Sequence, residues 1–130
     1  EHGGVQDMPG EAWHPYQGKY FVTPPFAEYP SGHSVFSGAA AEILERFRKS
    51  RFFGASVVVP AGASKIETGA PAYDIELRWA TFYDASREAG MSRLYGGIHF
   101  EKGNLDGLSM GEQVAQKVWQ KCTALWQGRF

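Results

Sequence analysis

Hydrophobic positions recur at intervals of three and four over residues 34–48, which predicts an amphipathic helix. Its apolar stripe comprises Val35, Phe36, Ala39, Ala40, Ile43, Leu44 and Phe47. Charged residues such as Glu42 and Glu45 fill the opposite side. Either Ser31 or Ser34 can cap the first turn, because a serine hydroxyl accepts a hydrogen bond from a free backbone N–H there.

Two more helices are predicted farther along the chain. One extends from about Glu76 to Glu88 with Gly90 as its stop, and a separate turn follows at residues 92–95. The last helix is expected to begin near Leu105 or Gly107. Its apolar stripe comprises Leu108, Gly111, Val114, Ala115, Val118, Cys122 and Leu125. These spacings predict a largely helical chain.

Between the helices, the short β-branched run 56–60 predicts a strand or an extended loop, and residues 60–75 predict a loop. Residues 1–32 are rich in glycine, proline and aromatic residues, so no long helix is expected there. An irregular stretch of this length is typical of a connection arriving from earlier helices. The Glu1 start, without an initiator Met or a signal segment, leads us to expect a processed chain or the middle of a longer product.

Composition changes this picture in one respect. Aromatic residues make up 15% of the 130 residues, so either the core is dense or part of the apolar surface meets a partner. The net charge of −1 gives no indication of a nucleic-acid or membrane-surface partner. No apolar run approaches the roughly 18 residues of a membrane span. The single cysteine, Cys122, rules out an internal disulfide.

A candidate anion site begins at Ser31-Gly32-His33, directly before the first predicted helix. Free amides at a helix start attract anions, and the helix dipole adds to that attraction. A serine hydroxyl can donate to the anion, and a histidine can exchange a proton near neutral pH. The same residues would also serve as an ordinary turn before a capped helix.

A second candidate element contains Arg93 and His99, separated by the pair Gly96-Gly97. The arginine fork suits a tetrahedral oxyanion, and the histidine can act as a nucleophile or as a ligand of a metal oxyanion. On an unbroken helix the two side chains would point about 120° apart, but a bend at the glycines lets them converge. Alternatively, the arginine is in a surface ion pair and the histidine lies at a loop edge.

Taken together and in this order, the two elements resemble the last two of three signature motifs of the phosphatase–haloperoxidase superfamily, which includes the type 2 phosphatidic acid phosphatases. The flanking segments 23–34 and 92–100, together with Asp106-Gly107-Leu108 and Gly111, are similar to bacterial-type vanadium-dependent haloperoxidases. The resemblance extends from about Pro24 to about Val118.

The resemblance implies an all-α helical bundle completed by an N-terminal portion. Residues 1–130 would be the C-terminal part of one such domain, with 1–32 as the irregular connection and 33–130 as the motif-bearing helices. Ser31, the Gly32 amide and Arg93 would bind equatorial oxygens of the cofactor vanadate, or of phosphate in its place. His99 would be the apical vanadium ligand, or the nucleophile of a phosphatase, and His33 the acid–base group.

Two departures from the family pattern leave the chemistry open. The first signature motif, which supplies a Lys and an Arg, is absent: Lys19 is the nearest candidate, and Phe26 stands where the Arg would fall. An N-terminal fragment or companion chain is therefore expected as a partner. The family also places an Asp four residues after the metal-binding histidine, whereas this chain has Gly103.

Three functions follow from the resemblance and its departures. The first is a vanadate-dependent haloperoxidase that oxidises halide with hydrogen peroxide. The second is a catalytically silent relative that binds an elongated apolar ligand, such as a pigment or lipid, among its aromatic residues. The third is a phosphomonoesterase. The resemblance also favours a secreted or periplasmic location.

Overall fold

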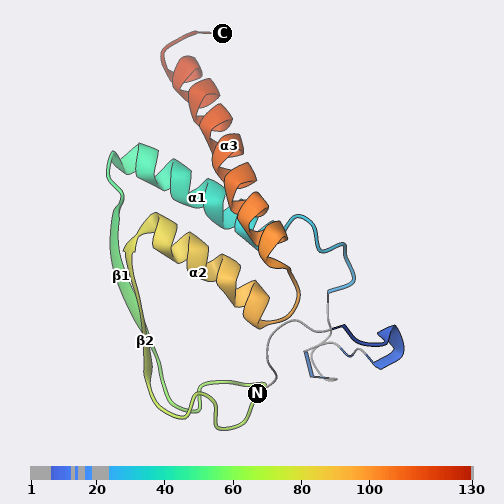
Figure 1. The fold of residues 1–130 in the computed structure, drawn as a ribbon. Coiled ribbons are helices and arrows are strands. Elements are labelled where there is room, and N and C mark those ends of the chain that lie inside the picture. The colour runs from blue at the N-terminus through green and yellow to red at the C-terminus, as the bar shows by residue number, and fades with distance from the viewer. Residues whose placement is uncertain (1–6, 13, 15–16, 19–23, 130) are drawn as a thin grey trace.

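The computed structural model describes residues 7–12, 14, 17–18 and 24–129 of the chain. Figure 1 shows helices α1 (Gly32–Arg48), α2 (Phe82–Tyr95) and α3 (Glu101–Trp126) packed together, with strands β1 (Phe52–Val59) and β2 (Ile75–Thr81) as a hairpin at one side. A short 3-10 helix covers Gly10–Ala12. The predicted helical bundle is confirmed, but the prediction of a purely all-α chain is wrong because of the hairpin.

The first predicted helix is confirmed as α1. Ser31 is its N-cap, and the Ser31 hydroxyl accepts from the backbone N–H of Ser34 at 3.4 Å. Lys49 ends the helix in the left-handed conformation, with φ of 54°. Both ends therefore lie within two residues of the prediction.

Strand β2 of the hairpin replaces the first part, residues 76–81, of the helix that was predicted at residues 76–88, and the rest of that prediction is helical. β1 and β2 pair antiparallel, with Val57 opposite Leu77, and an irregularity near Gly54 shifts the register between Phe52 and Ala55. The physical reason lies in the sequence Ile75-Glu76-Leu77-Arg78-Trp79, which alternates apolar and polar residues as a strand does. The predicted strand at 56–60 is real but begins earlier, at Phe52.

Helix α2 begins six residues after the predicted start and continues through Gly90, which was expected to stop it. A capping box between Thr81 and Asp84 fixes its start, because each side chain bonds the other's backbone N–H at 2.9–3.0 Å. Gly90 is buried because the Asn104 side chain of α3 lies where a β-carbon would project. The separate turn predicted at 92–95 is the last turn of α2.

Helix α3 begins at Glu101, several residues before the predicted start, and includes Gly103 and Gly107. These glycines let α3 approach its neighbours closely. A β-carbon on Gly107 would lie 2.9 Å from the Ser31 carbonyl oxygen, and one on Gly111 would strike the Val35 carbonyl. Tertiary contact thus outweighs the low helix propensity of glycine.

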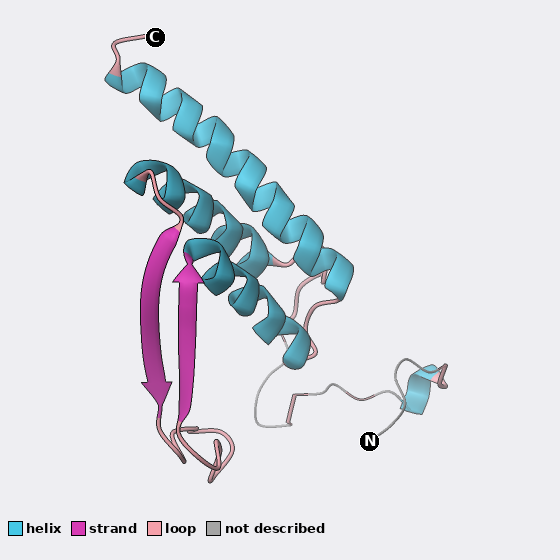
Figure 2. Cartoon of the chain, turned by 60° about the vertical axis from the view of Figure 1, so that its left-hand side comes forward, coloured by secondary structure: helices cyan, strands magenta, loops and turns pink. Residues whose placement is uncertain are grey.

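The core between the helices is small. Its buried apolar residues in the described part are Ala41, Phe82, Leu108 and Ala115. Several large apolar side chains of α1 and α3 remain exposed, including Phe36 at 78% and Val118 at 48%. Figure 2 shows α3 extending well past the end of α1. No described helix is long and apolar enough to cross a membrane.

Candidate functional site

The motif residues gather where three element ends meet: the start of α1, the end of α2 and the start of α3 (Figure 1). The segment before α1 is held against α3 by two hydrogen bonds. The Ser31 amide donates to the Gly103 carbonyl at 3.0 Å, and the Tyr29 hydroxyl donates to Asp106 at 2.8 Å. These bonds bring residues about 70 positions apart in the chain to one place.

Ser34 donates its single hydroxyl hydrogen to the Asn104 side-chain oxygen at 2.6 Å, which ties α1 to α3. Ser31 is fully buried, and its hydroxyl donates to the Ser34 hydroxyl oxygen at 2.8 Å. The capping role of Ser31 is thus confirmed, while its binding of an anion stays a prediction. Gly32 is exposed at the first turn of α1, and a β-carbon there would meet nothing within 4 Å.

His33 lies within electrostatic reach of both Arg93 and His99. Partial burial lowers the pKa of His33 below its ordinary value, and the positive charge of Arg93 and the neighbouring His99 imidazole lower it further. The neutral imidazole is the form that can accept a proton. The structure therefore brings these three predicted site residues together.

The chain bends at Gly96 and Gly97, as the sequence predicted. Gly97 has φ of 67°, and the Ile98 amide donates to the Arg93 carbonyl at 3.2 Å, which closes the end of α2. Arg93 lies in the last turn of that helix. Its Nε atom is buried and finds no hydrogen-bond partner among the described residues.

His99 is buried, with 6% of its surface exposed. Its Nδ1 atom lies 2.6 Å from the backbone carbonyl oxygen of Glu28. A carbonyl can only accept, so Nδ1 carries the proton and Nε2 of the neutral ring has a free lone pair. This Nε2 atom is also buried and without a partner in the part of the chain that the structure describes.

Glu28 was not among the predicted site residues, yet it contacts His99 twice. Besides its carbonyl, one carboxylate oxygen lies 3.7 Å from His99 Nδ1, and the other accepts from the Phe100 amide at 3.2 Å. A β-carbon on Gly103 would lie 2.5 Å from that second oxygen. The signal in the sequence was a lone acidic residue in an apolar, proline-rich segment, together with the missing acid at 103.

Phe26, which stands in place of the family arginine, stacks on the His99 ring, and the two ring centroids lie 6.0 Å apart. Both residues line an open cavity of about 370 Å³. Asp106 does not take the place of the missing acid beside His99. It instead accepts hydrogen bonds from Tyr29 and, at 2.7 Å, from Lys102. Lys19 lies outside the described residues.

These residues fit an oxyanion better than a metal cation. Within the described ranges, no group of three or more His, Cys, Asp or Glu side chains could hold a metal ion. The unpartnered atoms at the site are instead the Arg93 Nε donor and the His99 Nε2 lone pair. A donor beside a free imidazole lone pair matches the oxygens and the central atom of vanadate, respectively.

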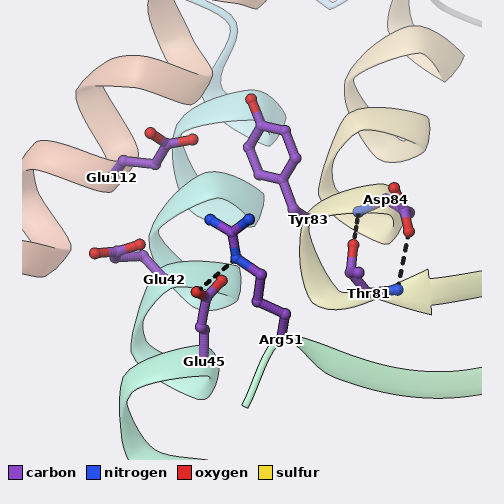
Figure 3. Close-up of a pocket in the computed structure, with 7 residues that line it drawn as sticks. All are labelled: Glu42, Glu45, Arg51, Thr81, Tyr83, Asp84 and Glu112. Carbon is purple, nitrogen blue, oxygen red and sulfur yellow. Dashed lines mark hydrogen bonds and ion pairs between the residues drawn. The ribbon is translucent and has the colours of Figure 1, made fainter. Parts of the chain in front are cut away.

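A second hollow, at the other end of α1, carries different chemistry (Figure 3). Glu42, Glu45 and Glu112 line it, and Arg51 bonds Glu45 at 3.0 Å. Burial raises the pKa of Glu112, and the neighbouring charges of Glu42 and Glu45 raise it further. None of the motif residues lines this hollow.

Comparison with known proteins found a matching family of helical-bundle domains. Residues 1–128 match the family model of the VCPO second helical-bundle domain. No curated protein matches the chain.

Three solved structures of bacterial enzymes are similar. An apo-type vanadium-dependent chloroperoxidase shares 28% identity over 77% of this chain, with a TM-score of 0.71. The holo-type structure shares 27% identity over 87% of this chain, with a TM-score of 0.72. A vanadium-dependent iodoperoxidase shares 33% identity over 85% of this chain, with a TM-score of 0.59. The chain spans 22%, 23% and 24% of those three structures.

Proposed function

Because the chain belongs to the family of VCPO second helical-bundle domains, we propose that it provides the vanadate-holding part of a haloperoxidase that oxidises halide with hydrogen peroxide. The observation that carries the proposal is the pair of buried, unpartnered atoms at Arg93 and His99. Burying a polar atom without a partner costs free energy, so such atoms are typical of a site built for a ligand.

Each site residue has a distinct task in this proposal. His99 Nε2 offers its lone pair to vanadium, while Arg93 and the first amides of α1 neutralise the oxyanion charge. His33, whose pKa is lowered, would accept a proton from hydrogen peroxide. It would later return that proton to the peroxide oxygen that leaves as water. Vanadate, when bound, would supply the activation of peroxide toward halide.

We further propose that a companion polypeptide, an N-terminal fragment or a separate chain, completes the site. It would supply the Lys and Arg of the missing first motif. The exposed apolar groove between α1 and α3, lined by Ile43, Leu44, Val114 and Val118 among others, supports this, because apolar surface of that kind is typical of an interface.

The test is vanadate binding by calorimetry, followed by halide oxidation with peroxide, using the protein together with its companion. We expect both to be lost in H99A, which removes the vanadium ligand, and retained in H14A, which removes an exposed imidazole outside the motif segments. Absence of vanadate binding in the wild-type assembly, or full activity in H99A, would refute the proposal.

The same preparation separates the alternatives. Hydrolysis of a phosphomonoester that vanadate inhibits, without halide oxidation, would replace the haloperoxidase by a phosphatase that uses His99 as nucleophile. A coloured or lipid-loaded protein that binds no vanadate would instead favour the silent, ligand-binding relative.

A further inference from the structure

We propose that Glu28 is the positioning residue of His99, and that it takes over the task of the acid missing at position 103. The inference rests on the proposed function, because the orientation of His99 matters to an oxyanion only if His99 binds one. It adds a residue from a different segment of the chain to the site. That segment precedes α1, whereas position 103 lies in the first turn of α3.

The first part of the argument is geometric. The Glu28 carbonyl oxygen lies 2.6 Å from His99 Nδ1, so it fixes the proton on that nitrogen and leaves Nε2 free. The Glu28 side chain then reaches past the ring to the Phe100 amide, at 3.2 Å. Glu28 thus holds His99 through its backbone carbonyl and Phe100 through its side chain. The His99 ring cannot turn without breaking the hydrogen bond to Glu28.

The second part concerns the space at position 103. Gly103 is buried, and a β-carbon there would lie 2.5 Å from one Glu28 carboxylate oxygen and 2.9 Å from the carboxylate carbon. Glu28 and a side chain at 103 therefore exclude each other. The Glu28 carboxylate lies where a side chain at position 103 would project. The segment before α1 therefore supplies the negative charge that an acid at position 103 would otherwise supply.

The third part is electrostatic. One Glu28 carboxylate oxygen is buried and accepts no hydrogen bond from the described residues, and it lies 3.7 Å from His99 Nδ1. A buried carboxylate is costly unless positive charge lies nearby. When a negative charge stands behind the Nδ1–H group, the opposite nitrogen becomes a stronger ligand, and loss of such a carboxylate typically costs about 10–100-fold in affinity.

Two variants separate charge from anchoring. In E28Q the amide oxygen can still accept from Phe100, but the charge is gone, so we expect vanadate to bind about 10–100-fold more weakly in calorimetry. The matched control is E101Q, which removes an exposed carboxylate from the same turn of α3 and should leave the affinity unchanged. Equal affinities for E28Q and the wild type would overturn the inference.

A carboxylate swap gives the sharper test. E28A removes the carboxylate and its bond to the Phe100 amide but keeps the backbone carbonyl, and E28A/G103D returns a carboxylate from position 103 to the vacated space. We expect vanadate affinity to fall in E28A and to recover, at least tenfold, in the double variant. A double variant no better than E28A would contradict the proposal, provided that circular dichroism shows both to be folded.

A readout without vanadate distinguishes failure of this inference from failure of the proposed function. Hydrogen exchange of the Phe100 amide in the free chain, followed by NMR, reports whether a carboxylate holds this segment. We expect slow exchange in the wild type and in E101A, faster exchange in E28A, and slow exchange again in E28A/G103D, because an acid at the third helical position can also accept from the amide of the N-cap residue. If this pattern holds while the wild-type assembly binds no vanadate, only the function is refuted. If Phe100 exchanges equally slowly in E28A and in the wild type, the positioning role is refuted.

Discussion

His33 illustrates how neighbouring groups tune a single residue for its task. The ring is partly buried and faces the Arg93 guanidinium and the His99 imidazole, and all three influences lower its pKa. A lowered histidine pKa means that the neutral ring contributes stability above the ordinary value of about 6.5, and this contribution is lost as the pH falls through the lowered value. The residue is therefore neutral, and able to accept a proton, at neutral pH.

At this residue we predict that R93Q raises the pKa of His33 partway toward its ordinary value, because it removes the guanidinium charge beside the ring. Burial, the largest cause, would persist. Proton NMR titration of the His33 ring measures the change. R87Q, which removes an exposed arginine earlier in α2, is the control and should leave the midpoint in place. No difference between the two variants would show that Arg93 does not act on His33.

The pKa of Glu112 is shifted in the opposite direction from that of His33, because it is raised. Its raised pKa means that the folded state holds the proton more tightly than the unfolded chain, so stability is greatest below the ordinary glutamate pKa and declines as the pH rises through the raised value. We predict that E112Q stabilises the protein at pH 7 by less than about 1 kcal/mol. The gain should vanish near pH 3.5, where both forms are neutral, as thermal unfolding at the two pH values can test. Destabilisation at pH 7 would contradict this account.

Elements that pack by close backbone approach depend on single glycines. Where α1 crosses α3, a β-carbon on Gly111 would strike the Val35 carbonyl and lie 2.8 Å from the Ala39 amide. Backbone atoms cannot swing aside, so the helices would have to separate.

We therefore predict that G111A destabilises the fold by about 1–3 kcal/mol, even though alanine favours a helix by about 1 kcal/mol. Urea unfolding measures the change. G10A is the control, because a β-carbon there meets nothing within 4 Å. An unchanged free energy of unfolding in G111A would show that α1 and α3 separate at little cost.

Elements also show how far the sequence alone could go. α1 was predictable within two residues because its apolar period is strong and Ser31 marks its start. β2 was predicted as helix because Leu77, Ala80 and Tyr83 also satisfy a helical spacing, although the alternation from Ile75 to Trp79 favoured a strand. The early start of α3 could not be predicted, since Gly103 is tolerated only because of what packs on it.

The candidate site was predictable to a similar degree. Motif order placed Arg93 and His99 in one region and the double glycine predicted the bend between them, which the structure has. Glu28 could not be assigned to His99, because nothing local links two residues 71 positions apart. Its role depends on how the segment before α1 packs on α3.

At the scale of the whole molecule, the chain carries a candidate anion site and an exposed apolar face. The proposed companion would add two cationic contacts, and each charge-assisted hydrogen bond is worth about 1.5–3 kcal/mol. We predict that the chain alone binds vanadate about 10²–10⁴-fold more weakly than the chain with its companion. Calorimetry on both preparations measures the ratio. Equal affinities would mean that the site needs no outside residues.

The length of α3 has a consequence of its own. All its buried residues lie between Gly103 and Ala115, while the helix continues to Trp126 beyond the reach of α1. The last three turns therefore have little to hold them except their own hydrogen bonds and the edge contact of Trp119 with Trp126. Amide protons there should exchange with solvent at the fraying limit, while those near Gly107 follow global opening. A protein that docks along the C-terminal end of α3 would therefore slow deuterium uptake there, and this slowing would reveal the contact.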